Sequence, residues 1–173
     1  MRRVFQVEQD DPLAAPLLAE LAIEYSTRYG GTAGAVHQDL LTYPAAEFAP
    51  PSGALLVVVE HGEPVAGGAF RRYDAETAEL KRIWTARGHR RRGLGRFVLT
   101  ELEAEITRRG YRRVYLTTGP RQPEAVALYD AAGYTALERT VRHEAGLLHP
   151  FEKWLTDAAD VGTVSGGEAE VYA

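Results

Sequence analysis

The sequence contains no cysteine and no hydrophobic run long enough to cross a membrane. Without cysteine there can be no disulfide bond, no thiolate metal ligand and no cysteine nucleophile. A membrane-spanning helix needs roughly 20 mostly apolar residues, and no stretch of this chain offers them. The N-terminal segment also lacks the apolar core of a secretory signal, because Arg2 and Arg3 are followed by alternating residues and acids. From these absences we expect a cytoplasmic protein with no membrane association.

The sequence also lacks the overall positive charge of many nucleic-acid-binding proteins. Its 173 residues carry 20 Lys and Arg against 24 Asp and Glu, which gives a formal net charge of −4. Positive charge is concentrated between Lys81 and Arg96. A nucleic-acid-binding module built on this cluster is an alternative that the acidic background disfavours, so we expect no nucleic acid partner. His, Asp and Glu show no convincing metal-ligand spacing, so we expect no metal.

The length predicts one domain, 1–156, followed by a flexible tail, 157–173, that is rich in Gly, Ala, Asp and Glu. Periodicity and turn residues predict seven strands, at 3–7, 55–59, 65–71, 78–85, 114–117, 134–141 and 151–155. They predict helices over 11–30, 94–110 and 123–133, and a short interrupted helix within 39–48. Hairpin turns between consecutive strands favour an antiparallel meander, and the strand–helix–strand order after residue 78 predicts one parallel pair.

One stretch, from Glu79 to Leu99, combines a strand, a basic loop and the start of a helix. Gly93 and Gly95 lie at the junction, where the absence of a Cβ lets a ligand approach the backbone. The first amide groups of a helix have no partner within it, and together with the helix dipole they favour a phosphate. Five arginines surround this junction: Arg87, Arg90, Arg91, Arg92 and Arg96. The stretch therefore predicts a phosphate-binding loop.

Two common phosphate-binding loops do not fit this stretch. A Walker A loop needs Lys and then Ser or Thr after its last glycine, and here Gly95 is followed by Arg and Phe. A dinucleotide fingerprint needs a third glycine three residues later, where this chain has valine. The remaining pattern, Arg90-x-x-Gly93-x-Gly95, resembles the acetyl-coenzyme A (acetyl-CoA) loop of the GCN5-related N-acetyltransferases, the GNAT superfamily, which reads Gln/Arg-x-x-Gly-x-Gly/Ala. Taken alone, the stretch also fits an ordinary helix start beside solvated arginines.

A second segment, 122–134, resembles the later GNAT motif Asn-x-x-Ala-x-x-Leu/Phe-Tyr-x-x-x-Gly-Phe. Five residues fall at the motif spacings: Ala125, Leu128, Tyr129, Gly133 and Tyr134. Gln122 stands where Asn is usual, and it keeps the amide but adds a methylene. Taken alone, this segment would be an amphipathic helix with a half-buried tyrosine. Two matches in the right order extend the resemblance over residues 3–155.

The resemblance implies an α/β (α+β) fold with a mixed, mostly antiparallel central sheet, a βαβ unit that binds acetyl-CoA, and helices on both faces. It implies transfer of an acetyl group from acetyl-CoA to an amine of a small molecule or peptide. Direct transfer is favoured, because the chain has no cysteine to carry the acetyl group and no Gly-x-Ser-x-Gly nucleophile elbow. A CoA-binding regulatory domain with little catalysis is the alternative. A homodimer is one option for its assembly.

By the same resemblance, the glycine loop should bind the pyrophosphate and the preceding strand end should receive the pantetheine arm. The expected cofactor-binding residues are Ile83, Trp84, Thr85, Arg90, Arg91, Arg92, Gly93, Leu94, Gly95, Arg96, Gln122 and Tyr129. Tyr129 is the candidate general acid for the leaving thiolate, because a phenol with a reference pKa near 10 is protonated at neutral pH.

Glu79 is the candidate general base, acting directly or through water. Strand alternation places Glu79, Lys81 and Ile83 on one face. A solvated glutamate at the start of a strand is the equally weighted alternative. His61 and His89 are weaker candidates, since both fall in predicted surface loops.

The resemblance also implies that the acceptor enters beside the first helix and the segment after it, which here means Tyr25, Tyr29 and residues 30–50. Three acids there could attract a cationic amine or could be ordinary surface charges: Glu24, Asp39 and Glu47.

Overall fold

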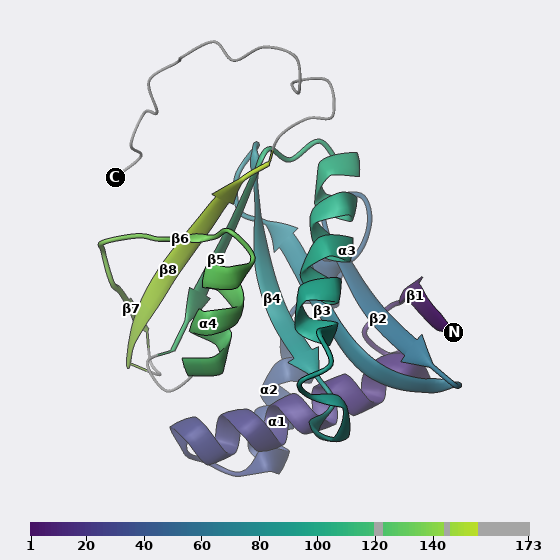
Figure 1. The fold of residues 1–173 in the computed structure, drawn as a ribbon. Coiled ribbons are helices and arrows are strands. Elements are labelled where there is room, and N and C mark those ends of the chain that lie inside the picture. Colours follow the sequence, from purple (N-terminus) through teal and green to yellow (C-terminus); the bar gives the residue numbers. More distant parts are fainter. Residues whose placement is uncertain (120–122, 144–145, 156–173) are drawn as a thin grey trace.

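The computed structural model describes residues 1–119, 123–143 and 146–155, which form a mixed sheet with helices on both faces (Figure 1). The strands are β1 (Arg2–Gln6), β2 (Ala54–Glu60), β3 (Glu63–Arg72), β4 (Thr77–Thr85), β5 (Arg113–Thr118), β6 (Thr135–Ala136), β7 (Val141–His143) and β8 (Gly146–Trp154). The helices are α1 (Ala15–Tyr29), α2 (Ala33–Thr42), α3 (Leu94–Arg108) and α4 (Pro123–Ala131), with short 3₁₀ helices η1 (Pro12–Ala14), η2 (Ala45–Phe48) and η3 (Arg87–His89). The predicted tail and Gln122 lie outside the described residues.

The strands follow the order β1-β2-β3-β4-β5-β8-β6, and β7 pairs with β8. Among the described strands, β4 and β5 form the one parallel pair, and the other neighbours are antiparallel. The parallel pair follows from the crossover through α3, because a hairpin can join only antiparallel strands. The prediction of a mostly antiparallel sheet with a βαβ unit is confirmed.

Two apolar layers lie on opposite faces of the sheet. On one face, α3 and α4 bury side chains such as Leu102 against the strands, and on the other α1 packs Leu17 against Trp84. Successive residues of β2 serve the two layers, since Leu56 belongs to the first cluster and Leu55 to the second. Burial on both faces explains the continuous apolar run of this strand.

Two adjacent glycines of β3 allow the helices to approach the sheet closely. A Cβ added to Gly67 would lie 2.8 Å from Leu17 Cδ1 of α1. A Cβ added to Gly68 would lie 2.7 Å from Ile83 Cδ1 and 2.9 Å from Leu102 Cδ1 of α3. Since real side chains do not tolerate such distances, the glycines let α1 and α3 pack directly on opposite faces of one strand.

The β4 strand bulges at Arg82, and the bulge changes which side chains share a face. Arg82 has a φ of 58°, and the register with β3 shifts beside it. Strict alternation predicts Ile83 on the same face as Glu79 and Lys81. That prediction is wrong, because Ile83 packs with Leu80 in the cluster under α3. The extra residue of a bulge moves every following side chain to the other face.

Two other segments differ from the sequence prediction. The interrupted helix within 39–48 is α2 followed by η2, and α2 begins earlier than predicted. Thr32 starts it, because its Oγ1 accepts a hydrogen bond from the Ala35 amide at 3.1 Å. The strand predicted at 134–141 is divided into β6 and β7, which both pair with β8.

Candidate functional site

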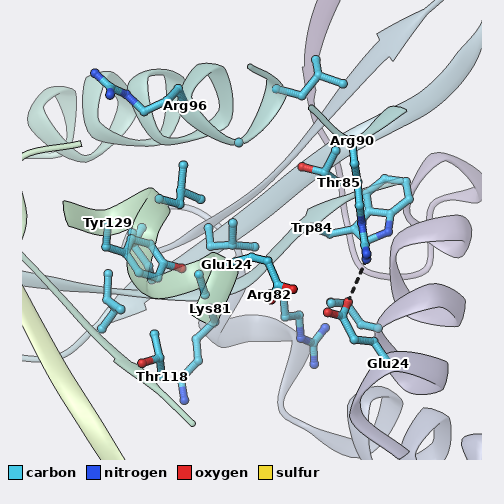
Figure 2. Close-up of a pocket in the computed structure, with 18 of the residues that line it drawn as sticks. Glu24, Lys81, Arg82, Trp84, Thr85, Arg90, Arg96, Thr118, Glu124 and Tyr129 are labelled. Atoms are coloured by element: carbon cyan, nitrogen blue, oxygen red, sulfur yellow. Dashed lines mark ion pairs between the residues drawn. The ribbon is translucent and has the colours of Figure 1, made fainter. Parts of the chain in front are cut away.

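The paired strands β4 and β5 separate where the candidate site begins. Their pairing covers only Thr77 to Glu79 of β4, opposite Arg113 to Tyr115 of β5, although both strands continue further. A cleft of about 610 Å³ lies beyond the last pair. Residues of α1, β4, the loop before α3, the first turn of α3, β5 and α4 line it (Figure 2). Backbone groups on the separated strand ends are therefore available to a ligand that enters between them.

The first turn of α3 presents amide groups to this cleft. Gly93 is the N-cap residue, with a φ of 73°, and it has no side chain that could cap the helix. The first hydrogen bond of the helix runs from the Phe97 amide to the Gly93 carbonyl oxygen, so the three amides between them have no partner within the helix. Leu94, Gly95 and Arg96 all line the cleft. Partial positive charge at this helix end favours an anion.

The arginines of the loop divide into two groups. Arg90, Arg91 and Arg96 line the cleft, and Arg90 Nη2 lies 3.6 Å from a carboxylate oxygen of Glu24 on α1 (Figure 2). Arg96 Nη1 donates to the Ala131 carbonyl oxygen at 2.6 Å, which ties α3 to the end of α4.

Arg92 is turned away from the cleft. Its Nη2 donates to Glu60 Oε2 at 2.7 Å, and its Nη1 lies 2.7 Å from His89 Nδ1. Hydrogen bonds from Arg92 and Arg2 lower the pKa of Glu60 to about 2. The Arg92 side chain therefore fastens the loop to the β2–β3 hairpin. Phosphate binding by Arg92 stays a prediction, and it concerns only the backbone amide.

Tyr129 lies on α4 with its ring in the core and lines the cleft (Figure 2). It packs edge-on against Tyr134, with ring centroids 5.6 Å apart, and against Phe151 at 5.9 Å. Burial raises the pKa of the Tyr129 phenol above its ordinary value of 10. The phenol is therefore protonated throughout the physiological pH range and can donate a proton to a group in the cleft.

Glu79 lies beside the cleft and is not one of its lining residues. Its side chain is buried, with Oε1 2.8 Å from Arg71 Nε and 3.4 Å from Lys81 Nζ. Arg71 also reaches Glu47 Oε2 at 3.2 Å. Lys81, in contrast, lines the cleft. The structure thus gives Glu79 ion partners instead of the solvent exposure of the alternative interpretation.

The structure separates the two tyrosines predicted at the acceptor site. Tyr25 lines the cleft, and burial, with a smaller effect of the Glu24 carboxylate, raises its pKa to about 12. Tyr29 is not among the lining residues, and its hydroxyl lies so close to Gly119 that a Cβ there would be 1.9 Å from it. Tyr29 therefore supports the chain after β5.

The three predicted residues at the end of β4 all line the cleft, but their side chains have different surroundings. Ile83 packs under α3. Trp84 points to α1, where its Nε1 donates to Glu20 Oε2 at 2.6 Å. Thr85 ends the strand and is half-buried (Figure 2).

Several lining residues were not predicted from the sequence: Arg28, Lys81, Arg82, Thr118 and Glu124. Arg28 and Glu124 form an ion pair at 3.5 Å that joins α1 to α4 across the cleft. The sequence offered one signal for these residues, the adjacent Lys81 and Arg82 in a predicted strand. A central strand seldom carries two cations, so the pair could have been taken as part of a site.

Over residues 1–119, 123–143 and 146–155, His, Asp and Glu form no group of three or more that could hold a metal ion. No helix in that same part of the chain has both the length and the apolar character needed to cross a membrane.

Comparison with known proteins places the chain in a family. The model of the acetyltransferase (GNAT) family matches residues 17–134. The uncharacterized N-acetyltransferase YsnE of Bacillus subtilis (strain 168) is 34% identical over 80 residues, which cover 44% of this chain and 53% of YsnE, about half the length of that relative. The uncharacterized N-acetyltransferase YjgM of Escherichia coli (strain K12) is 27% identical over 135 residues, covering 75% of this chain and 79% of YjgM.

A solved structure shows the same fold. The GNAT family acetyltransferase of Elizabethkingia anophelis, with acetyl-CoA bound, superposes with a TM-score of 0.61 at 17% identity, covering 89% of this chain and 98% of that protein. The sheet order, the separated parallel strands and the glycine loop agree with this likeness. The chain belongs to the acetyltransferase (GNAT) family, a family of acyltransferases.

Proposed function

We propose that the protein transfers an acetyl group from acetyl-CoA directly to an amine of a small molecule or peptide. The observation that carries this proposal is the position of the cleft. It lies where β4 and β5 separate, between the uncapped start of α3 and the phenol of Tyr129. One ligand can therefore contact the start of α3 with its phosphates and the Tyr129 phenol with its sulfur.

The chain's own groups supply the binding of acetyl-CoA. The amides at the start of α3, among them that of Arg96, would hold the pyrophosphate together with the side chains of Arg90 and Arg91, because guanidinium groups and helix N-termini both bind phosphate oxygens. The free backbone edges of β4 and β5 would hydrogen-bond the pantetheine amides. The Elizabethkingia anophelis relative, whose structure contains acetyl-CoA, supports this assignment.

In the transfer step, the amine nitrogen attacks the thioester carbonyl carbon, the new C–N bond forms and the C–S bond breaks. Tyr129 gives its phenolic proton to the departing thiolate, which leaves as the free thiol of CoA, and recovers a proton from solvent. Glu79 accepts the proton that the nitrogen must lose. Since Glu79 does not line the cleft, this proton travels through a bridging water.

A pair of glycine variants tests the cofactor site. A Cβ on Gly95 would lie 3.1 Å from Leu128 Cδ2, whereas one on Gly34 would meet nothing within 4 Å. We expect acetyl-CoA to raise the melting temperature of the wild type and of Gly34→Leu. For Gly95→Leu this shift should vanish, because its side chain forces α3 and α4 apart at the phosphate loop.

Activity is then measured as thiol release from acetyl-CoA across a panel of amines. Amine-dependent release by the wild type, lost in Gly95→Leu and kept in Gly34→Leu, is the expected result. A thermal shift without thiol release for any amine would instead identify a CoA-binding regulatory domain. An equal shift in both glycine variants would place acetyl-CoA elsewhere and overturn the proposal.

A further inference from the structure

The carboxylates of the cleft are already paired with arginines. Glu24 lies 3.1 Å from Arg28 and 3.6 Å from Arg90, and Glu124 lies 3.5 Å from Arg28. Among the described lining residues, no other acid is present. The expectation that Glu24 or Glu47 attracts a cationic amine loses support, because Glu47 also faces a cation, Arg71. The cleft therefore offers little attraction to an acceptor whose only charge is positive.

The two cations at the bulge of β4, Lys81 and Arg82, are less well paired with carboxylates. Lys81 shares its carboxylate, Glu79, with Arg71, which lies closer to it. Arg82 is only 7% exposed, and its guanidinium donates to two neutral oxygens, Gln9 Oε1 and the Leu40 carbonyl, each at 2.7 Å.

Within residues 1–119, 123–143 and 146–155, no carboxylate forms an ion pair with Arg82. The rings of Phe48 and Tyr43 lie 4.7 and 5.8 Å from its Cζ and supply only their π faces. A buried cation without an anion is unusual, because its desolvation is normally offset by an opposite charge. Arg82 lines the cleft, so a ligand there can provide that charge.

A hydroxyl in the same cleft also lacks a partner. Thr118, at the end of β5, is 3% exposed, and its Oγ1 is buried with no hydrogen-bond partner in the described part of the chain. Buried polar groups are nearly always hydrogen-bonded, so this hydroxyl is available to bond a ligand in the cleft. In Figure 2, Lys81, Arg82 and Thr118 lie in the lower part of the view, away from Arg96 and α3. In this view they are apart from Arg96, one of the residues of the proposed phosphate site.

We propose that the acceptor is an amine that also carries a carboxylate, as a free amino acid does, and that Lys81, Arg82 and Thr118 receive this carboxylate. The inference rests on the proposed acetyl transfer and adds the chemical class of the acceptor. One unpaired guanidinium, one shared ammonium and one hydroxyl suit a singly charged group better than a doubly charged phosphate. Binding the carboxylate would point the amine of the same molecule toward the thioester and Tyr129.

The test compares matched acceptors. Each free amino acid is paired with its amide, which keeps the side chain and the amine and lacks the negative charge. Each rate is divided by the concentration of unprotonated amine before the two are compared. We expect kcat/KM to be about 10- to 100-fold higher for the acids, the range expected for hydrogen bonds to a charged group. Amines that carry a phosphate should fall below the acids.

Variants locate the recognition site. Lys81→Met should reduce the acid-to-amide ratio at least fivefold, and Lys81→Arg should restore it. Thr118→Val should reduce the ratio by a smaller factor. Lys81 also contacts Glu79, so its loss could impair proton transfer. Such a defect would lower kcat/KM equally for the amino acids and their amides, and the acid-to-amide ratio would not change. Arg3→Met, an exposed β1 residue that does not line the cleft, is the control with an unchanged ratio.

Equal rates for acids and amides, a preference for phosphate-bearing amines or polyamines, or a ratio unaffected by Lys81→Met would overturn the carboxylate site. Absence of turnover for every free acid would overturn it too. In each case amine-dependent thiol release with other acceptors would leave the proposed acetyl transfer intact, so the two failures are distinguishable.

Discussion

The two ends of the cleft are built in different ways. The end proposed for the cofactor is lined by one short segment, within Arg90 to Arg96, and it presents backbone amides at the start of one helix. The end proposed for the acceptor brings together side chains from α1, the bulge of β4, the end of β5 and the start of α4. Backbone recognition needs only glycine and a helix start, whereas side-chain recognition depends on which distant residues the fold places side by side.

If the proposed division holds, substitutions at Lys81, Arg82 or Thr118 should alter charge and hydrogen bonding at the proposed acceptor end and leave the conformation of the glycine loop unchanged. Tyr129 lies where the two ends meet, since it is anchored in the core by Tyr134 and Phe151 and lines the cleft. A change confined to its hydroxyl should therefore affect the chemical step and neither end.

The largest effect is expected for Tyr129→Phe. Loss of the proton donor should lower kcat about 100- to 1000-fold, within the range usual for a general acid, and the KM for acetyl-CoA should change little. Because burial raises the pKa of the phenol above 10, the wild type should keep its activity as the pH rises from 7 toward 10, as far as this group is concerned. Steady-state kinetics over this pH range checks both expectations.

Tyr134→Phe is the matched control for that variant. Tyr134 is equally buried, contacts the Tyr129 ring and donates its hydroxyl proton to Glu103 at 3.3 Å, but it does not line the cleft. We expect a stability loss of about 1 kcal/mol, typical of one hydrogen bond, and a kcat within about twofold of wild type. Equal kcat values for both variants would remove Tyr129 from the chemical step.

A smaller effect is expected for Glu79→Gln. The amide keeps the shape of the side chain but cannot accept the proton, so kcat should fall about 10- to 100-fold at pH 7. At higher pH the defect should shrink, because more of the amine is then unprotonated without help. The measurement is kcat for both proteins at pH 7 and pH 9.

Glu47→Gln separates this role from a general weakening of the ion-pair network. Glu47 binds the same Arg71 as Glu79 does, and it lies further from the cleft lining, on η2. Its variant should stay within about threefold of wild type. A defect of the same size in both variants, or one that does not depend on pH, would make Glu79 a structural residue.

The sequence predicted the glycine loop and the start of α3 because their determinants are local. Gly93 adopts a left-handed backbone, and a Cβ on Gly95 would already lie 3.1 Å from Leu128 Cδ2, so a small residue is favoured there. Both requirements are visible in the sequence, because each position is a glycine. The side chain of Arg92 was the exception, because its partner, Glu60, is 32 residues away on β2 and no local pattern connects the two.

The surroundings of Arg82 and Thr118 could not be predicted for the opposite reason. The bulge at Arg82 reverses the faces of the residues after it, and a non-glycine residue with positive φ leaves no sequence signal. Thr118 looks like an ordinary strand residue, and nothing in its sequence context indicates that its hydroxyl has no hydrogen-bond partner among the described residues. Similarly, β6 and β7 read as one strand because both alternate, and the break between them depends on their pairing with β8.

The smallest effect concerns the tether between the glycine loop and the β2–β3 hairpin. Glu60 has a pKa of about 2 in the folded protein, below its ordinary value of 4.5, because Arg92 and Arg2 donate hydrogen bonds to it. A lowered pKa contributes stability above pH 4.5, and this contribution is lost as the pH falls through about 2. Glu60→Gln should therefore lower the urea midpoint slightly at pH 7, and its difference from wild type should shrink between pH 4.5 and pH 2.

Glu63→Gln, in the same hairpin and without an ion pair among the described residues, should show no such trend. A difference that stays constant down to pH 2 would show that the Arg92 tether does not stabilise the fold, and the loop would then owe its conformation to its glycines alone.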